Sequence, residues 1–268
     1  MTDHPDHQSA PSRSPHYPEL AGRVAVVTGA ARGMGACFAV GLARQGVHVL
    51  GVDIDEAALQ AALHAGQAGL AKHHGSLEGM RCDVSSRDAM QQVAAQAVQK
   101  FGQLDIWVNN AGIFPQTDIP SVTSGQITKA FEINVNGVFF GAQAAADHMK
   151  DGGVIVNMAS VAAFRVRRGR AVYSATKAAV HNLTQSLAVE LGGQNIRVNA
   201  LAPGFIDTEM TNWVREIPGA MDKALASIPL GRIGEPDDVL NVLLFLVSDA
   251  AAYVSGQTLG VDGGSRHG

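Results

Sequence analysis

Three side chains suited to acid–base chemistry on an oxygen atom lie close together in this chain. Ser160 ends an apolar, β-branched segment that begins at Val154, and Tyr173 and Lys177 follow after a loop. Four positions are about one helical turn, so Tyr173 and Lys177 would project from the same face of a helix. An ammonium beside a phenol favours the phenolate and lowers the phenol pKa from its free value of about 10. The stretch therefore predicts a tyrosine that exchanges a proton with an alcohol or carbonyl oxygen near neutral pH, with Ser160 reaching the same oxygen.

A second motif is suited to holding a pyrophosphate. Residues 23–28 read as a buried strand that runs into Gly29, Gly33 and Gly35, and an amphipathic helix follows to about residue 45. Glycines let the backbone turn tightly and approach a phosphate, which a helix N-terminus attracts through its free N–H groups and dipole. The spacing is GxxxGxG rather than GxGxxG. Glycines at such a junction also serve packing, so the motif alone leaves both interpretations open.

The next predicted strand, residues 48–53, ends in a carboxylate that bears on the choice of nucleotide. Asp53 lies about 20 residues after the glycine turn, where an acidic side chain accepts hydrogen bonds from ribose hydroxyls and repels a 2′-phosphate. Arg32 argues for NADP instead, because its guanidinium could pair with such a phosphate. Ile54 is not basic, so the sequence favours NAD over NADP. Alternatively, Asp53 is an N-terminal residue of the helix that starts at Asp55.

Further strand ends carry polar or small residues. Residues 80–84 are predicted as a strand, and Asp83 either hydrogen-bonds an adenine or caps the helix that begins near residues 85–86. Residues 104–108 are a strand that leads into Asn109, Asn110, Ala111 and Gly112. Small residues there would let a cofactor lie against the backbone.

Two other features have both a structural and a functional interpretation. Asn134 lies inside an apolar helix predicted over residues 121–149, either as a buried, hydrogen-bonded amide or as a carbonyl relay to the active site. The loop before Tyr173 holds four arginines. They could attract an anionic substrate, but a solvated loop is the favoured interpretation. The four are Arg165, Arg167, Arg168 and Arg170.

The C-terminal part is predicted to close over the site. After a strand at 196–201, the segment to about residue 229 contains a helix near 210–225 and resembles a lid. A helix at 235–248 and a strand at 258–261 follow. The lid's apolar walls would come from Met210, Trp213, Val214, Ile217 and Met221.

Strands and helices alternate along the chain. This order predicts an α/β fold: a single Rossmann-like, doubly wound parallel sheet of about seven strands with helices on both faces. One domain is expected over residues 21–268. Residues 1–20, rich in His, Pro and Ser, are expected to form a disordered arm. His4, His7 and His16 could bind a metal, but a solvated tail is favoured, and no metal site is predicted.

Composition narrows the class of protein. The net charge of −4 argues against nucleic acid as a partner. Cys37 and Cys82 fall in predicted buried elements and are expected to be reduced, as in the cytosol. Residues 1–20 contain no apolar signal segment, and the apolar stretch at 239–247 is too short to cross a bilayer. A cytoplasmic protein without a membrane partner is therefore expected.

Together, these motifs resemble one known family. Their order and spacing are similar to those of the short-chain dehydrogenases/reductases, over nearly everything after residue 20. The matching residues are Thr28-Gly29-x-x-x-Gly33-x-Gly35, Asn109-Asn-Ala-Gly112, Asn134, Ser160, Tyr173-x-x-x-Lys177 and Pro203-Gly204.

The resemblance implies roles for individual residues. Tyr173 would be the acid/base, Ser160 would orient the substrate oxygen, and Lys177 would hold the nicotinamide ribose and lower the Tyr173 pKa. Asn134 would hold a water that links Lys177 to solvent. The resemblance also implies a homotetramer. The implied cofactor-binding residues are Gly29, Arg32, Gly33, Met34, Gly35, Asp53, Asp83, Val84, Asn110, Ala111, Gly112, Tyr173, Lys177, Pro203, Gly204, Ile206 and Thr208.

The favoured function is hydride transfer between NAD(H) and a secondary alcohol or ketone, with a fairly hydrophobic substrate because of the apolar lid. An NADPH-dependent 3-oxoacyl-carrier reductase and a sugar or steroid dehydrogenase are alternatives within the family. A dinucleotide-binding sensor without turnover is an alternative from another class. The presence of Ser160, Tyr173 and Lys177 argues against it.

Overall fold

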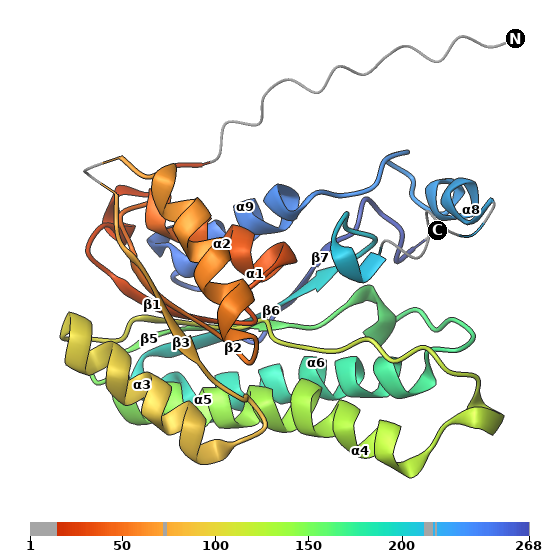
Figure 1. Ribbon diagram of the computed structural model, residues 1–268, viewed down its shortest axis with the longest axis horizontal. Helices are drawn as coiled ribbons and strands as arrows, with labels where there is room; N and C mark the ends of the chain where they lie inside the picture. Colours follow the sequence, from red (N-terminus) through yellow and green to blue (C-terminus); the bar gives the residue numbers. More distant parts are fainter. Residues whose placement is uncertain (1–14, 72–73, 212–216, 218, 268) are drawn as a thin grey trace, which may run out of the picture.

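Seven parallel strands form one sheet at the centre of the protein (Figure 1). The computed structural model describes residues 15–71, 74–211, 217 and 219–267. The strand order is β3-β2-β1-β4-β5-β6-β7, so the direction of winding reverses between β1 and β4. In an open α/β sheet, ligands bind at such a reversal, outside the carboxyl ends of the strands. The strands are β1 Val24–Thr28, β2 His48–Asp53, β3 Leu77–Arg81, β4 Ile106–Asn109, β5 Gly153–Met158, β6 Ile196–Pro203 and β7 Thr258–Val261.

Helices cover both faces of the sheet, which confirms the predicted fold class (Figure 1). One face packs against α1 (Gly33–Arg44), α2 (Glu56–Ala68) and α9 (Pro236–Val247). The other face packs against α3 (Arg87–Phe101), α5 (Gly137–His148) and α6 (Ala171–Leu191), with α4 (Ser124–Phe131) in the same layer. A separate short helix, α8 (Ala220–Ala226), lies beyond β7. Every residue of β1 is buried, as expected for a strand covered on both sides.

Three predicted elements differ from those observed. β3 begins three residues before the predicted strand and ends at Arg81, because it pairs with β2 in the register Asp53↔Arg81. β3 is an edge strand and only partly buried, which weakens its sequence pattern. The helix predicted over 121–149 is divided by a π-helical turn, Glu132–Asn136. In the part of the helix predicted near 210–225 that the structure describes, Glu209–Thr211 forms a 3₁₀ turn and α8 begins only at Ala220; residues 212–216 and 218 lie outside the described residues.

Part of the predicted N-terminal arm is packed against the sheet. Pro18–Leu20 forms a 3₁₀ turn, and Leu20 is completely buried. The Tyr17 backbone N–H donates to Gln45 Oε1 at 2.9 Å. The prediction of a disordered arm is therefore wrong for residues 15–20, since an apolar side chain and a backbone hydrogen bond hold them against α1. Residues 1–14 lie outside the described residues.

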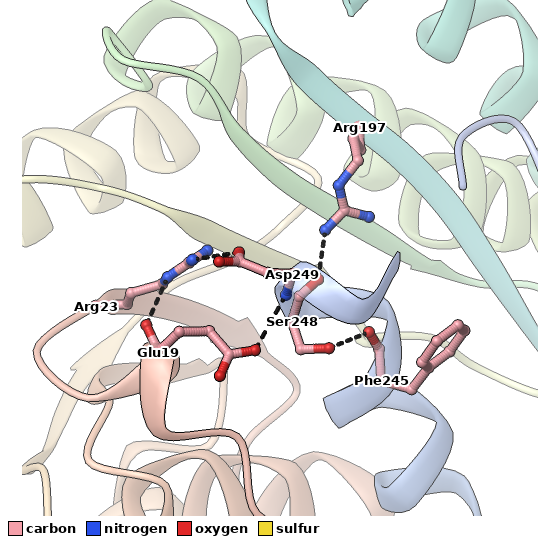
Figure 2. Close-up of polar contacts among 6 residues, drawn as sticks. All are labelled: Glu19, Arg23, Arg197, Phe245, Ser248 and Asp249. Carbon is pink, nitrogen blue, oxygen red and sulfur yellow. Dashed lines mark hydrogen bonds and ion pairs between the residues drawn. The ribbon is translucent and has the colours of Figure 1, made fainter. Parts of the chain in front are cut away.

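A cluster of polar contacts fastens the amino edge of the sheet (Figure 2). Arg23, just before β1, forms an ion pair with Asp249 at 2.7 Å and donates to the Glu19 carbonyl at 3.1 Å. The Asp249 N–H donates to Glu19 Oε1 at 3.2 Å, and Arg197 of β6 donates to the Ser248 carbonyl at 3.2 Å. These contacts join the N-terminal segment, β1, β6 and the end of α9 at the edge opposite the carboxyl ends of the strands.

The part of the chain that the structure describes contains no helix both long and apolar enough to cross a membrane. It also contains no group of three or more His, Cys, Asp or Glu side chains placed to hold a metal ion. His16 is exposed, while His4 and His7 lie outside the described residues.

Candidate active site

The three predicted catalytic side chains meet in one pocket at the carboxyl edge of the sheet. Ser160 lies two residues after β5, and Tyr173 and Lys177 lie in the first two turns of α6. All three line a cavity that we call the catalytic pocket. A neighbouring cavity, the nucleotide pocket, is lined by the glycine turn and by Asp53. The two cavities share lining residues, including Gly112, so they adjoin.

Lys177 is buried beneath the catalytic pocket. Its Nζ donates a hydrogen bond to the Met158 carbonyl at 2.5 Å and lies 5.7 Å from the centroid of the Tyr173 ring. Burial penalises the charged ammonium and lowers the pKa of Lys177 to about 8. The last carbonyl of β5 therefore fixes the position of a cation whose charge is sensitive to pH near neutrality.

Burial raises the pKa of Tyr173 above its ordinary value, against opposing effects of hydrogen bonding with Ser160 and the positive charge of Arg170. The sequence predicted a net lowering caused by Lys177. That prediction is wrong for the protein alone, because desolvation of the phenolate outweighs the stabilising contacts. The phenol ring packs edge-on against Phe114, with centroids 4.6 Å apart and planes at 82°. The structure therefore presents a protonated, well-positioned Tyr173.

Ser160 keeps its hydroxyl available to the pocket. It caps a short 3₁₀ turn, Val161–Ala163, where its Oγ accepts a hydrogen bond from the Ala162 N–H at 3.1 Å. A hydroxyl can accept and donate at the same time, so the capping contact leaves its proton free to be donated.

Asn134 is completely buried in the π-helical turn between α4 and α5. Its Oδ1 accepts from the Ile113 N–H at 2.8 Å, and its Nδ2 donates to the Ile113 carbonyl at 2.9 Å and to Thr176 Oγ1 at 3.1 Å. The side chain thus agrees with the interpretation of a buried, satisfied amide. It joins the segment after β4 to the helix that carries Tyr173 and Lys177, and it lines neither pocket.

The glycine turn brings backbone atoms too close together for side chains. Gly29 has a φ of +68°, which only glycine adopts easily. A Cβ at Gly35 would overlap the Gly29 carbonyl and lie 2.6 Å from Asn110 Nδ2. That amide donates to the carbonyls of Thr28 and Gly29 at 2.9 and 3.2 Å, which fixes the turn to the end of β4. The open backbone at the N-terminus of α1 fits a pyrophosphate.

Asp53 and Arg32 face the nucleotide pocket in different electrostatic settings. Asp53 accepts from the Ala31 N–H at 3.1 Å, and the cap of α2 is Asp55 rather than Asp53. Asp53 is therefore not the cap of α2, although its Oδ1 accepts from the Asp55 N–H at 3.0 Å and so also supports the start of that helix. Arg32 forms an ion pair with Asp55 at 2.5 Å and lies 3.6 Å from Glu209. Two carboxylates thus already offset the charge that could attract a 2′-phosphate.

Asp83 lies beside the nucleotide pocket together with Val84. The Ser85 hydroxyl and backbone N–H both donate to Asp83 Oδ1, at 2.7 and 3.0 Å, and these bonds lower the pKa of Asp83. Ser86, not Asp83, caps α3. The role of Asp83 as that helix's cap, left open by the sequence, is thereby excluded.

Every residue predicted to bind the cofactor lines one of the two pockets. Of the predicted lid residues, Met210 lines both pockets, Ile217 is exposed, and Trp213 and Val214 lie outside the described residues. Sequence reasoning gave no role to several residues that support the site. They are Ile113, Phe114, Met158 and Thr176.

The arginine-rich loop differs from its favoured interpretation. Arg165, Arg167 and Arg170 line the catalytic pocket, whereas Arg168 is outside its lining and forms an ion pair with Asp118 at 3.4 Å. The prediction of a solvated loop is wrong for Arg165 and Arg170, which are half-buried, and holds for Arg167 and Arg168, which are exposed. No local pattern in the sequence could reveal this difference.

Comparison with known proteins identifies the family. A family model described as enoyl-(acyl carrier protein) reductase matches residues 29–266. The chain belongs to the short-chain dehydrogenase/reductase family. The 3-oxoacyl-[acyl-carrier-protein] reductase of Thermotoga maritima is 39% identical over 247 residues, which is 91% of this chain and 98% of that protein.

Solved structures of short-chain dehydrogenases/reductases share the fold. A 7α-hydroxysteroid dehydrogenase complexed with NADH and 7-oxo glycochenodeoxycholic acid has a TM-score of 0.86 at 36% identity, over 91% of this chain and 94% of that one. A candidate NAD(P)-dependent gluconate 5-dehydrogenase from Beutenbergia cavernae, with NADP at low occupancy, has a TM-score of 0.85 at 36% identity, over 92% and 97%. The family therefore pairs this site with a nicotinamide cofactor and a small-molecule substrate, and leaves the choice of both open.

Proposed function

We propose that this short-chain dehydrogenase/reductase interconverts a secondary alcohol and its ketone with NAD(H), and that residues 21–268 form the catalytic domain. One observation carries the proposal: Ser160, Tyr173 and Lys177 converge in a pocket that adjoins a glycine-lined nucleotide pocket. Carbonyl reduction requires a group that protonates the carbonyl oxygen, a second group that hydrogen-bonds it, and a cation that stabilises the resulting phenolate, all beside a site for a nicotinamide.

Each catalytic residue has a distinct task in this mechanism. Tyr173 donates its proton to the carbonyl oxygen during reduction and accepts it during oxidation. Ser160 donates a hydrogen bond to the same oxygen and stabilises its developing negative charge. Lys177 holds the nicotinamide ribose hydroxyls and stabilises the phenolate that remains after proton transfer. The Asn134 side chain is occupied by its three hydrogen bonds, so its proposed part, holding the water that links Lys177 to solvent, would fall to its backbone carbonyl. The bound cofactor supplies or accepts the hydride.

The other proposed cofactor contacts follow from the lining of the two pockets. Gly29, Gly33 and Gly35 receive the pyrophosphate, Asp53 the adenosine ribose, and Asp83 the adenine. Ile206 and Thr208 lie beside Pro203 and Gly204 in the catalytic pocket, where they would hold the carboxamide.

NAD is the proposed cofactor because of the charges around the adenosine end. The carboxylate of Asp53 lines the nucleotide pocket, and Arg32 is engaged by Asp55 and Glu209. A 2′-phosphate would therefore meet a negative charge and a cation that is already paired.

Other substrates of the family are alternatives. Similarity to the Thermotoga maritima reductase favours an acyl-carrier substrate, and similarity to the hydroxysteroid dehydrogenase favours a bulky apolar ring. Apolar walls such as Ile113, Phe205 and Ile228 support a fairly hydrophobic substrate. A sensor without turnover is disfavoured, because all three catalytic groups are present and converge.

We further propose a cytoplasmic homotetramer. Exposed apolar side chains on α4, α5 and α6 support an interface along these helices; they are Ile127, Phe139 and Val189. Two unpaired cysteines, Cys37 and Cys82, suit a reducing compartment. Light scattering of the purified protein tests the assembly, and a monomeric mass would contradict it.

A panel of secondary alcohols and ketones, followed by NADH absorbance, tests the proposed activity. We expect turnover with NADH to exceed that with NADPH. Tyr173→Phe should keep NADH binding and lose nearly all turnover, a fall of about 10²–10⁴-fold for a lost acid/base. Tyr253→Phe is the matched control, because Tyr253 is fully exposed. Full turnover in Tyr173→Phe would mean that another group transfers the proton, and faster turnover with NADPH would mean that Asp53 does not select the cofactor.

A further inference from the structure

Positive charge is concentrated on the substrate side of the catalytic pocket. Arg165, Arg167 and Arg170, which we call the arginine rim, line this pocket together with the buried Lys177. The loop that carries the rim connects the turn capped by Ser160 to the start of α6. Among the described residues that line the pocket, none is Asp or Glu. The pocket thus has an excess of positive charge beside the catalytic groups.

Among the described residues, no carboxylate pairs with Arg165 or Arg167. Arg165 Nη1 donates to the Ser265 carbonyl, and Arg167 Nη2 donates to Ser227 Oγ at 3.2 Å. Both acceptors are neutral. A guanidinium has five N–H donors, so one such bond leaves most of them for a ligand. These two contacts fix the orientation of the Arg165 and Arg167 side chains. Their acceptors, Ser265 and Ser227, belong to two different segments of the C-terminal part of the chain.

The rim residues also repel one another. Partial burial and the charge of Arg165 lower the pKa of Arg167, and burial together with the charge of Arg167 lowers the pKa of Arg170. Arg170 additionally lies over the Phe114 ring, 4.9 Å from its centroid. A bound anion would relieve this repulsion and would gain charge-assisted hydrogen bonds.

Arg168, in the same loop, differs from the rim residues in its position. Its side chain is 90% exposed, it forms an ion pair with Asp118, and it is outside the pocket lining. Three arginines therefore face the pocket, and the fourth faces solvent and a carboxylate.

Apolar side chains line the same pocket. They include Val161, Phe205 and Ile228. A ligand that matches both features has an apolar body and an anionic group.

We propose that the arginine rim binds a carboxylate carried by the substrate, so that the substrate is an apolar secondary alcohol or ketone with an anionic group. The proposal rests on the function proposed above and adds a substrate class to it. Arg165 and Arg167 supply the main donors, and Arg170 adds positive charge close to Tyr173.

Matched pairs of charged and neutral ketones test the proposal. We would compare kcat/KM for 4-acetylbenzoate and 4-oxocyclohexanecarboxylate with the values for their methyl esters. The wild-type protein should prefer each carboxylate, and added salt should reduce the preference. In the double variant Arg165→Gln/Arg167→Gln, the ratio of carboxylate to ester should fall about 10- to 100-fold, the effect of losing charged hydrogen bonds.

Further variants separate charge from structure. Arg168→Gln, in the same loop, should keep the wild-type ratio. Arg167→Lys should retain more of the preference than Arg167→Gln, because it keeps the cation. A fold defect would lower kcat/KM for the carboxylate and for the ester alike. Loss of the anion site would instead lower the ratio of kcat/KM for the carboxylate to that for the ester. An unchanged ratio in the folded double variant, or an equal loss in Arg168→Gln, would overturn the proposal.

Calorimetry separates this proposal from the proposed activity. Binding of 4-acetylbenzoate and of its methyl ester is measured with NAD⁺ present, which cannot reduce a ketone. Tighter binding of the carboxylate, lost in Arg165→Gln/Arg167→Gln, would support the anion site even if no ketone in the panel were reduced. Equal binding of acid and ester by the wild-type protein would refute the anion site even if both were reduced.

Discussion

Lys177 Nζ donates a 2.5 Å hydrogen bond to the carbonyl of Met158, the last residue of β5. The buried cation is thus held by the backbone of the sheet, on the carboxyl edge where the pockets lie. Tyr173 lies one helical turn away on α6, and the phenol remains protonated because burial disfavours the phenolate. The protein alone is therefore prepared to donate a proton, which is the state that carbonyl reduction requires.

The first prediction concerns the pH dependence of that step. Lys177 has a lowered pKa of about 8, so it loses its charge as the pH rises above that value, while Tyr173 keeps its proton. Without the cation, the phenolate left after proton donation is no longer stabilised. We expect NADH-dependent ketone reduction to be constant below about pH 8 and to fall about tenfold per pH unit well above it.

The profile is measured as kcat/KM between pH 6 and pH 9.5. His181→Gln is the control, since His181 bonds to Thr258 outside the catalytic groups and its loss should leave the alkaline decline unchanged. A flat profile up to pH 9.5 would show that Lys177 keeps its proton or that its charge is not needed.

The second prediction concerns the choice of nucleotide. Asp53→Asn keeps the shape of the side chain and one acceptor oxygen for the Ala31 N–H, but it removes the negative charge from the nucleotide pocket and the acceptor of the Asp55 N–H. We expect kcat/KM for NADPH relative to NADH to rise about tenfold or more, the effect of one removed charge repulsion of about 1.4 kcal/mol. Asp88→Asn, an exposed change on α3 outside both pockets, should leave the ratio unchanged. The assignment of NAD as cofactor is wrong if Asp53→Asn also leaves the ratio of kcat/KM for NADPH to that for NADH unchanged.

The third prediction concerns the connection made by Asn134. Asn134→Ala removes three hydrogen bonds, two to the Ile113 backbone and one to Thr176, and leaves buried partners unsatisfied. We expect a loss of about 1–3 kcal/mol in the free energy of unfolding, together with lower turnover, because Thr176 is adjacent to Lys177. Asn136→Ala, at an exposed position in the same π-helical turn, should change neither. Denaturant unfolding and NADH turnover measure the two effects, and equal behaviour of the two variants would contradict this assignment.

The same residues show how far the sequence could predict the site. The spacing of Tyr173 and Lys177 fixes their common face because a helix has a fixed period, and the glycines mark the turn because no other residue fits. The position of the arginine rim depends instead on a loop that packs against residues about 60 to 100 positions away, Ser227 and Ser265. The pKa of Tyr173 depends on desolvation by all of its surroundings, which a pairwise argument from Lys177 omits.

Local sequence patterns also gave wrong bounds for elements whose structure depends on residues distant in the sequence. The predicted range of β3 was three residues too late in the sequence, because an edge strand shows little alternation of apolar and polar residues. Its register is set by pairing with β2. Asn134, in the π-helical turn, accepts from the Ile113 N–H, which is 21 residues away in the sequence. The fold class could be predicted from the order of elements, whereas the contacts that support the site required the tertiary structure.

The last prediction tests whether the glycine turn holds the nucleotide. A Cβ at Gly35 would overlap the Gly29 carbonyl and approach Asn110 Nδ2 at 2.6 Å, so Gly35→Ala must displace the turn or the amide that fixes it. The Gly29 carbonyl belongs to the backbone, and Asn110 Nδ2 is held by its hydrogen bonds to the Thr28 and Gly29 carbonyls, so neither moves aside easily. We expect NADH affinity to fall at least about tenfold, since backbone N–H groups at the N-terminus of α1 would move away from the pyrophosphate.

Gly125→Ala provides the matched control in another helix, because no atom lies within 4 Å of the added Cβ. Its helix should become slightly more stable, by about 0.5–1 kcal/mol, and NADH affinity should not change. NADH fluorescence titration measures affinity, and thermal unfolding with and without NADH shows whether the folded protein still gains stability from the ligand. If Gly35→Ala folds and binds NADH as tightly as the wild-type protein, then the glycine at this position serves only packing, and the nucleotide must contact the protein elsewhere.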